Sequence, residues 1–271
     1  MATATTGTVH AAVRAVPSTV PDAVALKTTL SPPATREAGT GKPVDCHRVK
    51  CVALTFDDGP GPYTDALLRH LKAHHAHATF FVVGQNAAAY PGVLRRTLAA
   101  GHEIGNHTWS HPDLTRLSAA RIRSQLARTD RAVKAATGVV PRLIRPPYGA
   151  LNRFVRRHTS RPLVLWSVDT LDWRYRDSAR VARRALKSVH PGSIILFHDI
   201  HPTTVRAIPR VLKKLSARGY TFVTVSQLFD GHPPRLVFSG PPPGCSELSR
   251  RLPLNFPRVP AVSHGVSGDR A

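Results

Sequence analysis

The order of apolar segments in this 271-residue sequence predicts an α/β fold, a distorted (β/α) barrel of about seven parallel strands. Short apolar runs alternate with segments whose apolar residues recur at helical spacing, an order typical of parallel sheets. Unusual polar clusters directly follow several of these runs, at the strand ends where barrel enzymes build their active sites. Because only about seven strands appear, the sequence does not by itself predict a regular eightfold barrel.

The first half of the predicted body contains its clearest elements. Residues 51–56 (CVALTF) are apolar and precede Asp-Asp-Gly-Pro, a pattern typical of a buried strand that ends in a loop. Pro91 and Gly101 bracket one helix, and Ser118 and Gly138 are suitable first and last caps for the longest one. The expected strands are 51–56, 78–83 and 102–106, and the expected helices are 64–74, 91–100 and 118–137.

The second half continues the alternation with shorter elements. Gly219 ends a helical pattern and is followed by a last apolar run. The expected strands are 143–145, 163–168, 193–197 and 220–223, and the expected helices lie near 151–157, 177–189 and 205–218.

Proline content divides the chain into a body and two tails. Residues 1–45 and 231–271 together hold 13 of the 24 prolines and have no sustained apolar periodicity, so we expect both to be poorly ordered. The body is then 46–230. No stretch approaches the ~18 apolar residues of a transmembrane segment. The first 30 residues do not resemble a signal peptide, since no basic start precedes an apolar run.

The chain is strongly basic, with 38 Lys or Arg against 16 Asp or Glu and a formal net charge of +22. The body carries 29 basic and 11 acidic residues, so the charge belongs to the folded part. Such a charge first suggests a nucleic-acid partner, but solvated helix faces account for much of it. Because no base-reading motif appears, we do not expect specific nucleic-acid binding.

Three cysteines are present, Cys46, Cys51 and Cys245. The spacing of the first two is too wide for a CxxC redox pair, and no second pair completes a zinc knuckle. A local disulfide between Cys46 and Cys51 is one interpretation, favoured if the protein is exported. Two unrelated thiols are the other interpretation, and the pattern assigns no role to Cys245.

Candidate metal ligands follow two of the predicted strands. Adjacent carboxylates such as Asp57 and Asp58 repel each other, so one can bind a metal while the other accepts a proton. His107 and His111 lie four residues apart, on one face of a helical turn, as metal ligands can. With Asp58 they would leave coordination positions open for water and substrate. An Asx-rich turn and the chance spacing of 15 histidines are the structural alternatives.

Two further clusters carry the other candidate groups. Arg145 ends a strand before two prolines, so its guanidinium could hold a carboxylate such as Asp57, and the Tyr148 N–H could face an oxyanion. His198 ends an apolar strand beside a carboxylate, a setting suited to a general acid. Trp173 follows another strand and could stack on a sugar ring. Each cluster also has a structural alternative. Arg145 could belong to a rigid turn, His198 could be a surface histidine or a hydrogen-bonded core histidine, and Trp173 could be an aromatic lid over the core.

In their joint order, TFDDG, HTWSH, RPPYG, DTLDW and LFH resemble the five motifs of the polysaccharide deacetylases, carbohydrate esterase family 4 or NodB-homology domains. The resemblance covers about residues 50–230. The cysteine pair before the first strand is also similar to secreted actinobacterial members. The resemblance implies that 46–230 is a catalytic domain that removes N-acetyl groups from glycans containing N-acetylglucosamine.

The resemblance also implies a role for each motif residue. Asp58, His107 and His111 would bind one divalent metal ion, Zn²⁺ first, with Co²⁺, Ni²⁺ or Mn²⁺ as alternatives. The other roles it implies are Asp57 as general base, Arg145 as its orienting partner, the Tyr148 amide as oxyanion donor, Trp173 and Leu196 as walls of the acetyl pocket, His198 as general acid and Asp172 as the group that adjusts its basicity.

Family membership would place the protein outside the cell or in the cell wall, and we expect a monomer. The basic body predicts electrostatic attraction to an anionic wall polymer. The substrate is left open among chitin, chitooligosaccharides and peptidoglycan. Acetylated xylan would instead make the protein an O-acetyl esterase.

Rival functions explain fewer of the motifs. An iron oxygenase with two histidines and one carboxylate would use the same ligands, but we expect such enzymes to be all-β, and Asp57 and LFH would have no role. A basic glycan- or nucleic-acid-binding protein without catalysis would not need the complete set of catalytic candidates.

Overall fold

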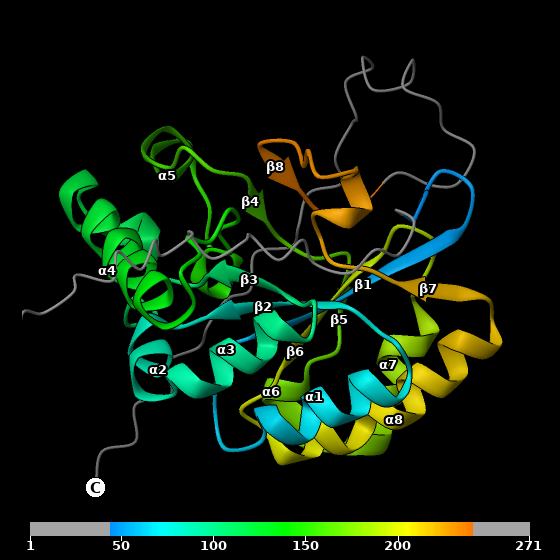
Figure 1. Ribbon diagram of the computed structural model, residues 1–271. Coiled ribbons are helices and arrows are strands. Elements are labelled where there is room, and N and C mark those ends of the chain that lie inside the picture. The colour runs from blue at the N-terminus through cyan, green and yellow to red at the C-terminus, as the bar shows by residue number, and fades with distance from the viewer. Residues whose placement is uncertain (1–43, 241–271) are drawn as a thin grey trace, which may run out of the picture. The chain divides into compact units, whose positions relative to one another are not determined.

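The computed structural model describes residues 44–240 and confirms the predicted α/β architecture with parallel strands (Figure 1). The main sheet has the order β3–β2–β1–β6–β5, and β7 also pairs with β1. Every ladder between named strands is parallel. The strands of this sheet are β1 (Lys50–Asp57), β2 (Ala78–Val82), β3 (Glu103–Asn106), β5 (Val168–Asp169), β6 (Ile194–His198) and β7 (Tyr220–Phe222).

A second, two-stranded ladder continues the series beyond β3. It consists of β4 (Leu163–Val164) and β8 (Leu236–Val237), and parallel bridges connect Asn106 to Ile144 and Ile144 to Leu163. Within residues 44–240 no ladder joins β5 to β8. The series is therefore consistent with a distorted barrel rather than a regularly closed one.

Helices follow most of the strands and cover the sheet. Figure 1 shows α1, α7 and α8 packed side by side below the main sheet, while α2 and α3 contact α4. The helices are α1 (Thr64–Ala73), α2 (Gly84–Ala89), α3 (Pro91–Ala99), α4 (Ala119–Thr137), α5 (Arg153–His158), α6 (Asp172–Tyr175), α7 (Ser178–Lys187) and α8 (Pro202–Ala217), with 3₁₀ turns η1 (Leu114–Arg116), η2 (Pro147–Gly149) and η3 (Gln227–Phe229).

The caps predicted for the longest helix are confirmed. The Ser118 side chain accepts a hydrogen bond from the Arg121 N–H at the start of α4. At the other end Gly138 adopts a φ of +80°, a conformation that costs glycine little because it has no Cβ.

Strand β1 is buried on both faces, as expected for a central parallel strand. Its side chains alternate between two environments. Val52, Leu54 and Phe56 belong to the large core cluster that also contains helix residues, and Phe56 stacks between two aromatic rings of the neighbouring strands. Thr55 and Asp57 therefore face the opposite side, away from the helix layer.

Several predicted elements differ from the observed ones. The strand expected at 163–168 is divided into β4 and β5, and 143–145 contributes only the bridges at Ile144. Helices α2 and α6 and strand β8 were not predicted. Each is two to six residues long, too short for apolar periodicity to reveal it.

The ends of the body also need correction. Residues 231–240 were expected in a poorly ordered tail, but β8 pairs with β4 and Val237 is 1% exposed. The high proline content concealed this short pairing segment. Cys46 and Cys51 form a disulfide. The structure therefore supports the local disulfide and not the alternative of two unrelated thiols. Cys245 and the tails at 1–43 and 241–271 lie outside the described residues.

A membrane span was not expected, and among the described residues no helix combines the length and apolar character needed to cross a bilayer.

Candidate active site

The predicted site residues gather at the carboxyl edge of the sheet. Asp57 is the last residue of β1 and pairs in register with His198, the last residue of β6. His107 directly follows β3, and Arg145 directly follows the bridge at Ile144. Because the strands are parallel, these ends meet at one edge, where ligands bind in α/β folds.

Arg145 is a fully buried cation held by four hydrogen bonds. Its Nη1 donates to Asp57 Oδ1 at 2.7 Å and to Thr55 Oγ1 at 2.8 Å. Its Nε and Nη2 donate to the carbonyl oxygens of Val164 and Leu165 at 3.2 and 2.9 Å. Its guanidinium also lies 4.2 Å from the centre of the Phe81 ring, in a cation–π contact. This network fixes the position of Asp57.

Asp57 is 2% exposed, and burial raises its pKa above the ordinary carboxyl value, although the charge and hydrogen bond of Arg145 oppose that effect. Arg145 holds Oδ1, while Oδ2 lies 3.7 Å from His107 Nε2. The carboxylate therefore has one anchored oxygen and one that faces the histidine cluster.

Three side chains could together hold a metal ion. One ligand atom from each of Asp58, His107 and His111 lies within 4.8 Å of the others. The Nε2 atoms of His107 and His111 are 3.2 Å apart. Asp58 Oδ1 lies 3.5 Å from Nε2 of His107 and 3.4 Å from Nε2 of His111. His107 Nδ1 contacts the Arg145 carbonyl oxygen at 2.7 Å. Since a carbonyl only accepts, Nδ1 is the donor and Nε2 keeps its lone pair.

The donor set of this cluster fits a divalent cation. Burial lowers the pKa of His107 to about 3, so its imidazole is neutral, as a metal ligand must be. Asp58 Oδ1 is buried and has no hydrogen-bond partner within residues 44–240. An unpaired buried carboxylate oxygen is costly unless a cation compensates it. Two imidazole nitrogens and one carboxylate form a set typical of zinc and neighbouring transition metals.

The turns around the cluster adopt strained conformations. Non-glycine residues with positive φ cost free energy and tend to occur at functional sites. Of the eight such residues in the described chain, five lie at this edge of the sheet: Asp58, Thr108, His111, Tyr148 and Leu171.

His198 and Asp172 form a second buried pair. Asp172 Oδ1 lies 2.8 Å from His198 Nδ1 and accepts from the Trp173 N–H at 2.9 Å. Its Oδ2 accepts from the His198 N–H at 2.7 Å and from Thr204 Oγ1 at 2.8 Å. Burial alone would lower the pKa of His198, but the hydrogen bond and charge of Asp172 outweigh it and raise that pKa to about 9.

Tyr148, Trp173 and Leu196 lie around these two pairs. The Tyr148 ring is 4.6 Å from the His111 ring, and its hydroxyl donates to the His111 carbonyl oxygen at 3.4 Å. Trp173 is 42% exposed and adjoins Asp172 through its N–H. Leu196 is buried on β6 two residues before His198, hence on the same face of the strand. All ten predicted residues thus lie at this edge.

Sequence reasoning missed the residues that hold these side chains in place. Thr55 lies two residues before Asp57, so strand alternation could have placed it on the same face. Thr204 comes from α8, and no sequence signal connects it to Asp172. The Asn106 side chain accepts from the Thr108 N–H at 2.8 Å and donates to the Leu126 carbonyl at 2.9 Å, which ties the histidine turn to α4.

Asp199 has a structural place that the sequence did not indicate. It is fully buried, and burial raises its pKa to about 7. Thr64 donates a hydrogen bond to it. A Cβ on Gly59 would lie 2.3 Å from Asp199 Oδ1, so only glycine allows the turn after Asp58 to approach this carboxyl.

Comparison with known proteins agrees with this geometry. The polysaccharide deacetylase family pattern matches residues 45–161. The chitooligosaccharide deacetylase of Bradyrhizobium sp. (strain ANU 289) is 36% identical over 203 residues, which are 68% of this chain and 93% of that protein. The chain belongs to the polysaccharide deacetylase family.

The chain is also similar to solved structures and to longer members of the deacetylase family. A structure described as T48 deacetylase with substrate has 50% identity and a TM-score of 0.70, covering 72% of this chain and 99% of that one. The peptidoglycan-N-acetylglucosamine deacetylase PgdA of Listeria monocytogenes is 44% identical over 181 residues, 66% of this chain. The match spans only 39% of PgdA.

Proposed function

We propose that this chain is a metal-dependent hydrolase that removes N-acetyl groups from a polysaccharide containing N-acetylglucosamine. The observation that carries the proposal is the position of the Asp57–Arg145 pair beside the Asp58–His107–His111 cluster and across the β1–β6 ladder from His198. The relatives named as deacetylases of peptidoglycan and of chitooligosaccharide support this class of substrate.

Asp58, His107 and His111 would hold the metal ion. When bound, it supplies Lewis-acid charge at the reacting oxygen atoms. Asp57 accepts the proton of the attacking water through Oδ2, while Arg145 holds Oδ1 and keeps the carboxylate oriented. The Tyr148 N–H donates to the oxyanion that forms when water adds to the amide carbonyl.

His198 completes the reaction on the leaving-group side. An amine leaves poorly unless it is protonated, and His198 carries a proton below its raised pKa of about 9. Asp172 binds Nδ1, so Nε2 is the nitrogen that delivers the proton as the carbon–nitrogen bond breaks. The products are acetate and a free amino sugar. Leu196 and Trp173 would line the pocket for the acetyl methyl group.

The same residues could cleave an O-acetyl ester, and a similar solved structure is described as a family 4 acetyl xylan esterase from Clostridium thermocellum. An alcohol needs less help from an acid than an amine does, so a strongly basic His198 favours the amide substrate. The Cys46–Cys51 disulfide supports an extracellular or wall location, because disulfides persist in oxidising compartments.

The test is acetate release from chitin, chitooligosaccharide, peptidoglycan and acetylated xylan, with chelator and with Zn²⁺ or Co²⁺ restored. We expect release from the N-acetylated substrates to disappear with the chelator and return with metal. Activity that ignores chelators would contradict the metal requirement, and release from xylan alone would favour the esterase.

A further inference from the structure

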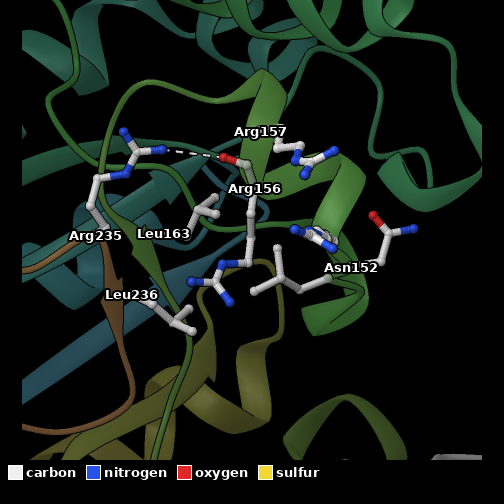
Figure 2. Close-up of a pocket in the computed structure, with 8 residues that line it drawn as sticks. Asn152, Arg156, Arg157, Leu163, Arg235 and Leu236 are labelled. Atoms are coloured by element: carbon white, nitrogen blue, oxygen red, sulfur yellow. Dashed lines mark hydrogen bonds between the residues drawn. The ribbon is translucent and has the colours of Figure 1, made fainter. Parts of the chain in front are cut away.

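A cavity of about 720 Å³ lies beside α5, and none of the residues that line it is among those assigned above. Its size is in the range of ligand pockets. Figure 2 shows the Arg156 side chain extending from α5 beside Leu163 and Leu236, while Arg235 is hydrogen-bonded to the main chain of Arg156. The complete lining is Leu151, Asn152, Arg153, Arg156, Arg157, Leu163, Arg235 and Leu236.

The charge of this cavity is uncompensated. It contains four arginines and no acidic residue, and within residues 44–240 no carboxylate pairs with any of the four. Other arginines of the body do have such partners, as Arg96 and Arg161 show. A group of like charges around one hollow repels itself, and anionic groups that enter the hollow would relieve that repulsion.

One arginine of the cavity is held by the backbone. Arg235 donates to the carbonyl oxygens of Arg156 and Thr159 at 3.2 and 2.8 Å, both in or just after α5. These contacts join the segment before β8 to the end of α5, and both Arg235 and Arg156 line the cavity. Arg153, Arg156 and Arg157 are exposed and their guanidinium groups make no hydrogen bond within the described residues, so they are available to an incoming anion.

The floor of the cavity is apolar. Leu163 is 2% exposed, and Leu151 and Leu236 pack against the same core cluster while remaining partly accessible. A cationic rim over a leucine floor suits a ligand that carries carboxylates together with small apolar groups. A simple phosphodiester polymer would use the rim but leave the floor uncovered.

The cavity is also close to the proposed reaction site along the chain. Leu151 follows Tyr148 by three residues, which span at most about 11 Å. A substituent on a glycan bound at the Tyr148–His111 contact could therefore reach it.

We propose that this arginine cavity binds the acidic peptide attached to a peptidoglycan strand, and so selects peptide-bearing glycan over bare chitooligosaccharide. The inference rests on the proposed deacetylase function and names the substrate class of that site. Guanidinium groups bind carboxylates through paired hydrogen bonds, and the leucines receive the small side chains of the peptide.

The test compares the triple variant Arg153→Gln/Arg156→Gln/Arg157→Gln with a control of equal charge change on α4, Arg121→Gln/Arg123→Gln/Arg131→Gln. Substrates are a peptide-bearing peptidoglycan fragment, the same fragment with its carboxylates amidated, and a chitooligosaccharide. For the cavity variant at low salt we expect KM for the acidic fragment to rise roughly fivefold to tenfold with kcat unchanged. KM for the other two substrates and for the control should not change.

A KM that is unchanged, that rises equally in the α4 control, or that rises equally for chitooligosaccharide would overturn the proposal. So would tight binding of a glycerol-phosphate polymer together with indifference to the peptide. Arg156→Gln alone, with its melting temperature measured, serves if the triple variant folds poorly. If the wild type deacetylates none of the substrates, the proposed function fails, and direct binding of the acidic fragment by calorimetry still decides the inference.

Discussion

The two charged pairs of the site are built in opposite ways. In the Asp57–Arg145 pair the cation is fixed, since Arg145 makes four hydrogen bonds and leaves one oxygen of Asp57 facing the histidine cluster. In the His198–Asp172 pair the anion is fixed. Within residues 44–240, Asp172 accepts four hydrogen bonds, and only one ring nitrogen of His198 is hydrogen-bonded. In each pair one partner is held in place and the other keeps an atom free for the reaction. This arrangement suits Asp57 as a base and His198 as an acid.

The largest effect should come from Asp57, whose Oδ2 faces the histidine cluster. Asp57→Asn keeps the shape of the side chain but removes its basicity, so we expect kcat/KM on an acetylated chitooligosaccharide to fall about 10²- to 10⁴-fold. Asp58, His107 and His111 are untouched, so metal content measured by mass spectrometry should stay at the wild-type level. Near-wild-type turnover would show that Asp57 is not the base.

The metal cluster can be separated from that base. His107→Ala removes one of three ligands, and we expect metal content and acetate release to disappear together, because two ligands hold a divalent ion poorly. Full metal occupancy in this variant would contradict the assignment of His107. Asp57→Asn is the matched comparison, since it should lose activity alone.

The fixed cation should matter to stability as well as to catalysis. Arg145→Gln leaves Asp57 buried without its partner, and breaking a buried ion pair costs about 3–5 kcal/mol of unfolding free energy. The matched control is Arg96→Gln, whose pair with Asp65 is exposed and should cost about 0–1 kcal/mol. If urea denaturation gave equal losses of unfolding free energy for the two variants, the buried Arg145–Asp57 pair would stabilise the protein no more than the exposed pair does.

The presented imidazole of the second pair is best tested by pH. Proton donation requires protonated His198, so wild-type kcat/KM should fall as the pH rises above about 9. On the acid side, protonation of Asp57 limits the same profile. Asp172→Asn removes the charge that raises this pKa while the burial that lowers it remains, so the alkaline limb should move to lower pH. The loss relative to wild type should be greater at pH 8 than at pH 6.

The control for that shift is Asp177→Asn, which makes the same charge change at the cap of α7, where asparagine also caps well. Its pH profile should match the wild type. An unmoved alkaline limb in Asp172→Asn would separate His198 from the acid step.

The sequence predicted the presented groups better than the fixed ones. Asp57, Asp58, His107, Arg145 and His198 each follow an apolar run, and the carboxyl ends of parallel strands must meet. Local patterns carried that information. Apart from the Trp173 N–H beside Asp172, the bonds that hold Arg145 and Asp172 come from residues 19 to 90 positions away in the chain, so no spacing reveals them. Strand β8 escaped for the same reason, since two residues pair with β4 across more than 70 positions.

The smallest effects should come from Thr55 and Thr204, which hydrogen-bond to Arg145 and Asp172 respectively. We also predict that the two substitutions differ in their cost in unfolding free energy. Thr204→Val removes one hydrogen bond to Asp172, which keeps three others, so we expect a loss of about 1–2 kcal/mol. Thr55→Val should cost more, because Thr55 both accepts from Arg145 and donates to the Ile195 carbonyl. Both sites are fully buried, and valine preserves the volume of threonine. Since three bonds still hold each fixed partner, kcat should fall only severalfold in either variant. If Thr204→Val lost more unfolding free energy than Thr55→Val, the prediction would be wrong. Asp172 would then depend on its supporting threonine more than Arg145 does.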